Sequence, residues 1–176
     1  AGPASIDRGS SSIRSTVPPP AGGEFAAPLV GREGRVGVGG LLTTASGLFE
    51  AVWVFDVGSG TLERTFVGSM PFPSGFAASV AMRGGRLLVG ENGRAFLYDL
   101  GTGSLLRTFT RLGASAFGML VDLDDAHAYV GGISLVDVFD ADSGVLLRTL
   151  APPAGNAFRG DGLAALPGGL VAVARD

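Results

Sequence analysis

Tyr98-Asp99-Leu100-Gly101-Thr102-Gly103-Ser104-Leu105-Leu106-Arg107-Thr108-Phe109 is one of three near-copies of the same segment in this chain. The other two copies occupy residues 55–66 and 139–150. Each copy combines an aromatic residue, an Asp, a Ser or Thr before Gly, and Arg-Thr before an apolar residue. The repeated Asp residues are 43 and 41 positions apart: Asp56, Asp99 and Asp140. A period near forty residues, with strand-forming chemistry in every copy, is typical of a β-propeller, in which each repeat is one four-stranded sheet or blade.

The remainder of each repeat also reads as a four-stranded antiparallel meander. The third strand is the aromatic-Asp segment, and an Asp-x-x-Ser/Thr-Gly turn leads to the fourth. The second strand ends near Val-Gly, and the first opens with Phe: Phe25, Phe76, Phe117 and Phe158. These pieces are short, rich in β-branched and aromatic residues, and bounded by Gly, Asp or Pro. We predict one all-β domain over residues 1–176, with repeats at 25–66, 76–109, 117–150 and 158–176.

The fourth repeat is incomplete, and the start of the chain supplies what it lacks. Residues 158–176 contain a first and a second strand, whereas residues 4–17 resemble a degenerate third and fourth strand. If the termini were joined, Arg148 and Arg14 would be 42 positions apart, which keeps the period. We therefore predict a β-propeller of about four four-stranded blades, with one blade shared between the two termini, because closure removes exposed strand edges. A four-repeat slice of a longer propeller is the alternative.

The repeat resembles the FG-GAP type of bacterial β-propeller repeat, a distant relative of the integrin α-chain propeller. The resemblance covers about residues 24–176 and is clearest from Phe76 to Phe109. The Gly-Ala-Pro and the calcium loop of that family have no intact copy here, so the resemblance implies the fold and no calcium site. Together with a start that is compatible with a processed terminus (Ala1 to Ser5), it favours an extracellular or periplasmic location.

The composition fits a folded β domain and argues against several classes of partner. Hydrophobic residues make up 46% of the 176, yet no uncharged apolar run approaches the roughly 18 residues of a membrane helix. The 13 basic residues are all Arg and are scattered, and the net charge is −3, so we expect no nucleic-acid partner. The chain has no Cys, which excludes disulfides and thiolate metal sites.

Two charged residues recur in every complete repeat, namely the Asp of the turn and an Arg in the fourth strand: Arg64, Arg107 and Arg148. By strand alternation Leu105, Arg107 and Phe109 share a face, so the Arg lies over apolar surface and reaches a carboxylate or a turn carbonyl. We interpret these Asp and Arg residues as a brace of the fold. An anion-binding ring is the alternative.

Asp122-Leu123-Asp124-Asp125 is the only dense carboxylate cluster in the sequence. It lacks the Gly and the late carboxylate of a calcium loop, so we predict a solvated acidic turn and no metal site. His127, the sole histidine, leads into an apparent strand, and no nucleophile motif accompanies it. We predict no catalytic residues and no cofactor.

An insertion in the first repeat is the feature that points to function. The second-strand Gly and the third-strand Asp are 17 positions apart in the first repeat (Gly39 to Asp56) and nine apart in the next two. In an antiparallel meander this turn and the link to the next blade emerge at the same rim. We predict a protein-binding patch at that rim, made of Leu41, Leu42, Leu48, Phe49, Met70 and Phe72. A hairpin extension folded back over its own blade is the alternative.

These features favour a non-catalytic interaction or scaffold module, a subunit of a larger assembly that binds a protein partner through the insertion face, residues 41–50. A binder of a small ligand or carbohydrate in the central channel is the alternative, with first-strand residues such as Ser79 and Ser115 facing inward. A hydrolase or lyase is less favoured, because the sequence shows no paired acid and base.

Overall fold

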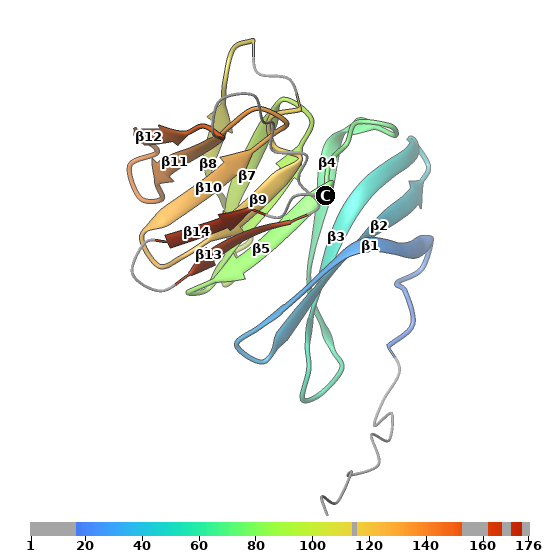
Figure 1. Ribbon diagram of the computed structural model, residues 1–176. Helices are drawn as coiled ribbons and strands as arrows, with labels where there is room; N and C mark the ends of the chain where they lie inside the picture. The colour runs from blue at the N-terminus through green and yellow to red at the C-terminus, as the bar shows by residue number, and fades with distance from the viewer. Residues whose placement is uncertain (1–16, 114–115, 153–161, 167–169, 174–176) are drawn as a thin grey trace, which may run out of the picture.

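Every regular element is a β-strand in the part of the chain that the computed structural model describes, residues 17–113, 116–152, 162–166 and 170–173 (Figure 1). The first sheet contains β1 (Gly23–Arg32), β2 (Arg35–Thr44), β3 (Gly47–Asp56) and β4 (Leu62–Pro71). The second contains β5 (Ser79–Arg83), β6 (Arg86–Glu91), β7 (Arg94–Asp99) and β8 (Leu105–Thr110). The third contains β9 (Leu120–Leu123), β10 (His127–Gly131), β11 (Val136–Asp140) and β12 (Leu146–Leu150). β13 (Leu163–Leu166) and β14 (Leu170–Val173) form a two-stranded sheet.

The sheets are joined side by side through their first strands. Within each sheet the strands follow one another as an antiparallel meander. From sheet to sheet, β1 contacts β5, β5 contacts β9, and β9 contacts β13. Figure 1 shows the first sheet, in blue to green, beside the other three. The first strands therefore form the inner layer around which the sheets are arranged.

The core lies between successive sheets, because the third strand of each four-stranded sheet is buried on both faces. In β3, Val52 and Val54 pack against the second sheet, whereas Trp53 faces the other way. In β7, Leu97 packs toward the third sheet and Phe96 toward the first. Successive side chains of a strand point to opposite faces, so each third strand requires apolar cover on both sides.

The repeated Asp forms the turn between the third and fourth strands. Oδ1 of Asp56 accepts hydrogen bonds from the backbone N–H and the hydroxyl of Ser59, at 2.7 and 2.8 Å. Asp99 and Asp140 make the same two contacts with the Ser or Thr three residues later. The Gly that follows adopts a positive φ, 71° at Gly60, which Gly accommodates without strain.

The first strands of the second and third sheets begin later than the sequence pattern indicates. Phe76 and Phe117, expected to open β5 and β9, lie in the links before them and are buried between sheets. The residues that directly follow them, Ala77 and Gly118, have positive φ values of 61° and 88°. This backbone conformation interrupts an extended strand, so pairing starts only after it.

The fourth sheet is described only as the β13–β14 pair. Residues 4–16, predicted to complete it as third and fourth strands, lie outside the described residues, as do 158–161. The predicted number of blades and the blade shared between the termini therefore remain predictions.

One glycine of the Val-Gly pattern marks a close approach between neighbouring sheets. A methyl group on Gly90, in β6, would lie 1.9 Å from the carbonyl oxygen of Gly118, in the link that leads to β9. Such a separation is far inside van der Waals contact, and the obstructing atom is backbone. Gly90 is therefore required by the packing of the second sheet against the start of the third.

We expect Gly90→Ala to lower the free energy of unfolding by about 1–3 kcal/mol or more, because the clash forces the two backbones apart. Gly31→Ala is the matched control. A methyl group there would have its nearest neighbour at 3.9 Å, and we expect a change of about 1 kcal/mol or less, toward higher stability. Urea denaturation of the two variants measures the difference. Equal midpoints would contradict the role assigned to Gly90.

Candidate functional site: the rim of the hairpin extension

The eight extra residues of the first repeat lengthen the β2–β3 hairpin. β2 and β3 pair without a register shift from Arg35↔Asp56 to Thr44↔Gly47, which leaves Ala45 and Ser46 as the turn. The extension therefore continues the plane of the sheet. It does not fold back over the sheet, the arrangement considered as the alternative from sequence.

The fourth strand follows the extension. Phe49 of β3 lies opposite Pro71 of β4, and the backbone N–H of Phe72 donates to the carbonyl oxygen of Leu48 at 2.8 Å. A register shift between Phe49 and Ala51 gives β4 additional residues there, so the link to the second sheet leaves from the side of the hairpin. The insertion and the link thus meet at one rim, as expected for a meander.

Strand alternation divides the six predicted patch residues between two faces of the extension. Leu42 lies opposite Phe49 on the face that carries Trp53. The other four lie on the opposite face, and we call this set the hairpin face: Leu41, Leu48, Met70 and Phe72. The sequence placed all six on one surface, because alternation across an unknown register is not visible in the residues alone.

The hairpin face is apolar and largely open to solvent. Met70, Phe72 and Leu48 are 54%, 48% and 37% exposed, and Leu41 is half-buried. Leu48 and Phe72 are direct cross-strand neighbours, as the hydrogen bond between their backbones shows. Leu48 and Phe72 are therefore an exposed apolar pair on an ordered sheet, with Met70 two residues before Phe72, and by the same alternation Thr43 and Glu50 also lie on this face.

A carboxylate that sequence reasoning missed holds this rim together. Oε2 of Glu50, in β3, accepts hydrogen bonds from the N–H and the hydroxyl of Ser74, at 3.0 and 2.6 Å, and from the N–H of Phe76 at 3.0 Å. A carboxylate with three donors fixes the link 74–76 against the hairpin. No sequence signal identifies Glu50, because it lies inside the insertion and has no counterpart in the other repeats.

A second carboxylate, this one buried, fixes the corresponding turn of the second sheet. Glu91, 1% exposed, accepts from Nε of Arg94 at 2.5 Å across the β6–β7 turn. The guanidinium carbon of Arg94 also lies 5.1 Å from the ring centroid of Phe96, a cation–π contact. The rim is thus held by polar contacts beneath an apolar surface.

The opposite rim carries the repeated Arg residues, whose contacts are those of a brace. Arg64 donates through Nη2 to the carbonyl oxygen of Gly101, in the Asp turn of the second sheet. Arg107 makes the same contact with the carbonyl oxygen of Asp142, in the turn of the third sheet. Arg64 and Arg107 therefore each tie one sheet to the turn of the next through a backbone carbonyl.

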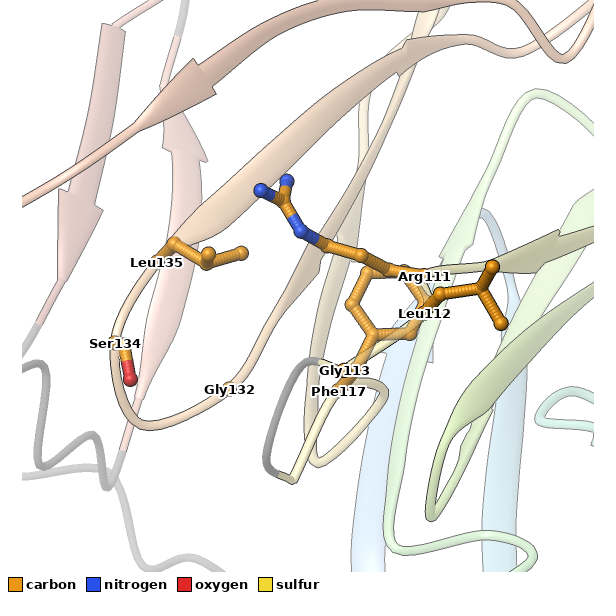
Figure 2. Close-up of a pocket in the computed structure, with 7 residues that line it drawn as sticks. All are labelled: Arg111, Leu112, Gly113, Phe117, Gly132, Ser134 and Leu135. Carbon is orange, nitrogen blue, oxygen red and sulfur yellow. The ribbon is translucent and has the colours of Figure 1, made fainter.

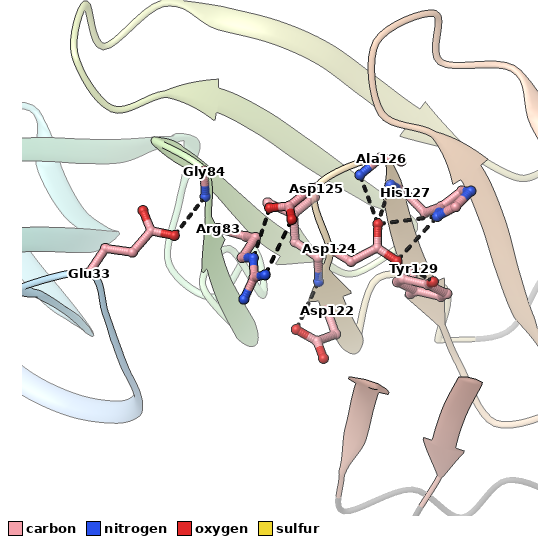
Figure 3. A network of polar contacts seen from close by, with 10 residues as sticks. Glu33, Arg83, Gly84, Asp122, Asp124, Asp125, Ala126, His127 and Tyr129 are labelled. Carbon is pink, nitrogen blue, oxygen red and sulfur yellow. Dashed lines mark hydrogen bonds and ion pairs between the residues drawn. The ribbon is translucent and has the colours of Figure 1, made fainter. Parts of the chain in front are cut away.

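Two carboxylates of the acidic segment contact neighbouring sheets near this polar rim (Figure 3). Asp125 forms an ion pair with Arg83 of the second sheet, at 2.8 Å. Asp122 accepts from the backbone N–H of Ala165 in β13. Glu33 of the first sheet reaches the N–H of Gly84 at 3.0 Å in a similar contact. Asp122 and Asp125 thus add contacts between sheets, while the Asp125 side chain remains 73% exposed in the acidic turn.

Asp124 is the most highly coordinated carboxylate of this segment (Figure 3). It accepts from the hydroxyl of Tyr129 at 2.7 Å and from the backbone N–H groups of Ala126 and His127 at 2.8 and 2.7 Å, and it contacts Nδ1 of His127 at 3.1 Å. Burial alone would raise the pKa of Asp124, but these hydrogen bonds outweigh it and lower the pKa to about 2. Burial and the bond to Asp124 raise the pKa of Tyr129 to about 12.

The central-channel alternative gains no support from Ser79. The Ser79 hydroxyl accepts a hydrogen bond from the backbone N–H of Val121 at 3.0 Å, which links β5 to β9. The contact that the structure shows for this hydroxyl therefore lies between sheets. Ser115, the second residue of that interpretation, lies outside the described residues.

Within the described ranges, His, Cys, Asp and Glu side chains nowhere gather in threes or more in a way that would hold a metal ion. These same residues include no helix with the length and apolar character to cross a membrane.

Comparison with known proteins establishes the fold and nothing finer. No protein-family model matches the sequence, and the curated proteins give no match. The chain is similar to the solved β-propeller domain of the Trilobed protease from Pyrococcus furiosus, which has an open velcro topology, with a TM-score of 0.53 and 9% sequence identity. The similarity covers 76% of this chain and 45% of that chain, so this chain spans less than half of that protein's length. Together with the four-stranded antiparallel sheets, this similarity shows that the chain folds as a β-propeller.

The contacts of Asp124 predict a pH dependence of stability. Because the pKa of Asp124 is about 2 in the folded protein and 3.8 ordinarily, its ionised form stabilises the fold above about pH 4, and this contribution is lost as the pH falls to about 2. Tyr129→Phe removes one donor and moves the folded pKa toward the ordinary value. The melting temperature should then fall less steeply over this interval.

Tyr98→Phe is the matched control, since Tyr98 packs between the first two sheets. Calorimetric melting temperatures from pH 5 to pH 2 give the slope for each variant. An unchanged slope in Tyr129→Phe would show that its hydroxyl does not hold the pKa of Asp124 down.

Proposed function

We propose that this chain is a non-catalytic β-propeller interaction module that docks a protein partner on the hairpin face. The observation that carries the proposal is the exposed apolar strip of Leu48, Met70 and Phe72 on a paired three-strand extension. Met and aromatic side chains are enriched at the buried centres of protein interfaces. A folded domain gains nothing by exposing such a strip, so a partner that covers it accounts for its presence.

The rigidity of the hairpin face supports the same proposal. The extension is held by the β2–β3 and β3–β4 pairings, and Glu50 fixes the link beside it. A surface that is already ordered loses little conformational freedom when a partner binds, so more of the contact energy appears as affinity. A partner surface that fits the hairpin face is apolar and elongated. It does not have to supply hydrogen-bond donors to Glu50, because this carboxylate already accepts from Ser74 and Phe76.

We also propose that the ring of sheets closes through the start of the chain, with residues 4–17 completing the β13–β14 sheet. Val17 supports this, because it packs against the face of the first sheet that points away from the second sheet, beside Trp53 and Phe55. Phe66 and Phe109, which precede the links to the second and third sheets, pack against the following sheet in the same way, each with a ring centroid 4.8 Å from an aromatic ring there. The assignment to the FG-GAP type belongs to this proposal and draws support from the segment Phe76 to Phe109.

The docking proposal predicts that the variant Met70→Asp/Phe72→Asp loses its partner and keeps its fold. Two charges in the centre of an apolar contact would each be desolvated without a counter-charge, which costs several kcal/mol. Size-exclusion chromatography with light scattering, on protein isolated from its source, should show a particle heavier than the chain's own 17.7 kDa that this variant reduces.

Leu105→Asp/Leu147→Asp is the matched control, because both residues are 51% exposed on fourth strands away from the hairpin. This variant should retain the heavier particle. A wild-type mass of one chain, or equal masses for the two double variants, would contradict docking at the hairpin face.

The closure proposal predicts that Ile13→Asp in the full chain disturbs the face of Trp53, the only tryptophan. If residues 4–17 cover this face, a buried charge there should lower the melting temperature and shift Trp53 fluorescence to longer wavelength as water reaches the indole. Ser12→Asp, one residue away and on the opposite side of a strand, serves as the control. If both variants emit and melt like the wild type, residues 4–17 do not cover Trp53.

A further inference from the structure

A pocket of about 330 Å³ opens at the same rim as the hairpin extension, between the second and third sheets (Figure 2). One side is formed by the link after β8, residues 111–113 together with Phe117. The other side is the β10–β11 turn, with Gly132, Ser134 and Leu135. In Figure 2 the side chain of Leu135 points toward the guanidinium of Arg111, and the ring of Phe117 is seen at the backbone end of the Arg111 side chain.

Arg111 is held in place by a buried acid. Its Nη1 donates to both oxygens of Asp137, at 2.5 and 2.6 Å, and to the hydroxyl of Thr149 at 3.1 Å. Asp137 is 1% exposed, and Thr149 also donates to it at 2.6 Å. All contacts of the guanidinium with the described residues thus involve a single nitrogen. The edge formed by Nε and Nη2 makes no hydrogen bond with these residues. This edge of a guanidinium can bind a carboxylate through two parallel hydrogen bonds.

The ion pair presents its positive end to the pocket. Asp137 is enclosed, whereas the Arg111 side chain is 33% exposed and lines the cavity. A ligand in the pocket is therefore nearer to the cation than to the anion, and the reduced polarity of a partly enclosed site strengthens that difference. Asp137 stands where the other sheets have aromatic residues, three positions before the turn Asp: Trp53 and Phe96. This exception places a cation, held by a buried acid, beside this pocket.

We propose that this pocket binds a carboxylate carried on a short apolar group. The carboxylate is held by Nε and Nη2 of Arg111, and the apolar group lies against Leu135. At about 30 Å³ per water-sized group the cavity accommodates on the order of ten heavy atoms. The carboxylate comes either from a free small acid or from the carboxyl terminus of a polypeptide, since both present the same chemistry to Arg111.

The test is an NMR titration of the full chain with N-acetyl-leucine, N-acetyl-leucine amide and a tetrapeptide that ends in a free leucine carboxylate. We expect saturable shifts of the backbone signals of Phe117, Gly132 and Leu135 with N-acetyl-leucine and none with its amide. Shifts by the tetrapeptide at equal or lower concentration identify a polypeptide terminus as the source, and shifts by the small acid alone identify a free acid. No saturation by either carboxylate below about 10 mM, or equal binding of the amide, overturns the proposal.

Two variants separate binding from folding. Arg111→Lys keeps a charge beside Asp137 but has no two-nitrogen edge, so affinity for the bound carboxylate should fall by about tenfold or more while the fold is retained. Ser134→Phe fills the mouth of the pocket and should abolish binding, whereas the same substitution at Ser46, in the exposed β2–β3 turn, should not. Unchanged affinity in both pocket variants overturns the assignment.

This inference goes beyond the proposed docking function, and the two proposals are tested by different variants. Met70→Asp/Phe72→Asp alters the hairpin face and contains no residue that lines the pocket. If that variant loses its partner and still binds the carboxylate, the two sites are independent. If it keeps its partner while Arg111→Lys loses the ligand, only docking at the hairpin face has failed.

Discussion

The burial of each third strand on both faces is the constraint on which the rest of this molecule depends. Val52, Trp53 and Val54 follow one another in β3 with no exposed surface, and the third strands of the next two sheets repeat the pattern. A strand without a polar face is stable only between two apolar layers. Each sheet therefore requires neighbours on both sides, and a ring of sheets meets that requirement with little exposed edge. The first sheet shows this requirement clearly, because the large side chains of Trp53 and Phe55 lie on its outer face and need apolar cover there.

The two rims satisfy their polar groups in different ways. On one rim the repeated Asp turn accepts the guanidinium of the preceding sheet, and Arg83, Asp122 and Asp125 add contacts between sheets. The carbonyl and carboxylate groups named here make contacts that hold the sheets together. The other rim is free of this repeated brace, so its loops vary in length and chemistry. Variation in loops on a rigid frame is the usual origin of binding surfaces.

Acidic residues with polar partners organise the variable rim, one for each complete sheet: Glu91 and Asp137 are buried, and Glu50 is half-buried. Glu50 holds the link beside the hairpin, Glu91 holds Arg94, and Asp137 holds Arg111. Their sequence positions do not coincide, which is why a repeat pattern does not reveal them. Each places a polar anchor beneath an exposed surface, and an enclosed carboxylate that lost its partner would be costly. The hairpin face and the pocket are both built on such anchors.

The sequence alone determined the strand order within each of the three complete repeats, the Asp turns and the rim at which the insertion lies. These depend on local hydrogen bonds, on side-chain alternation and on a fixed period, all of which can be read along the chain. Only the tertiary structure decided that Leu42 and Phe49 lie on the opposite face from Met70 and Phe72, that Phe76 and Phe117 precede their strands, and that the acidic segment joins sheets. Such features depend on the cross-strand register and on contacts between residues forty or more positions apart. Glu50 and Arg111 acquire their roles in the same way, because their partners come from other strands, links and turns whose proximity no single stretch of sequence records.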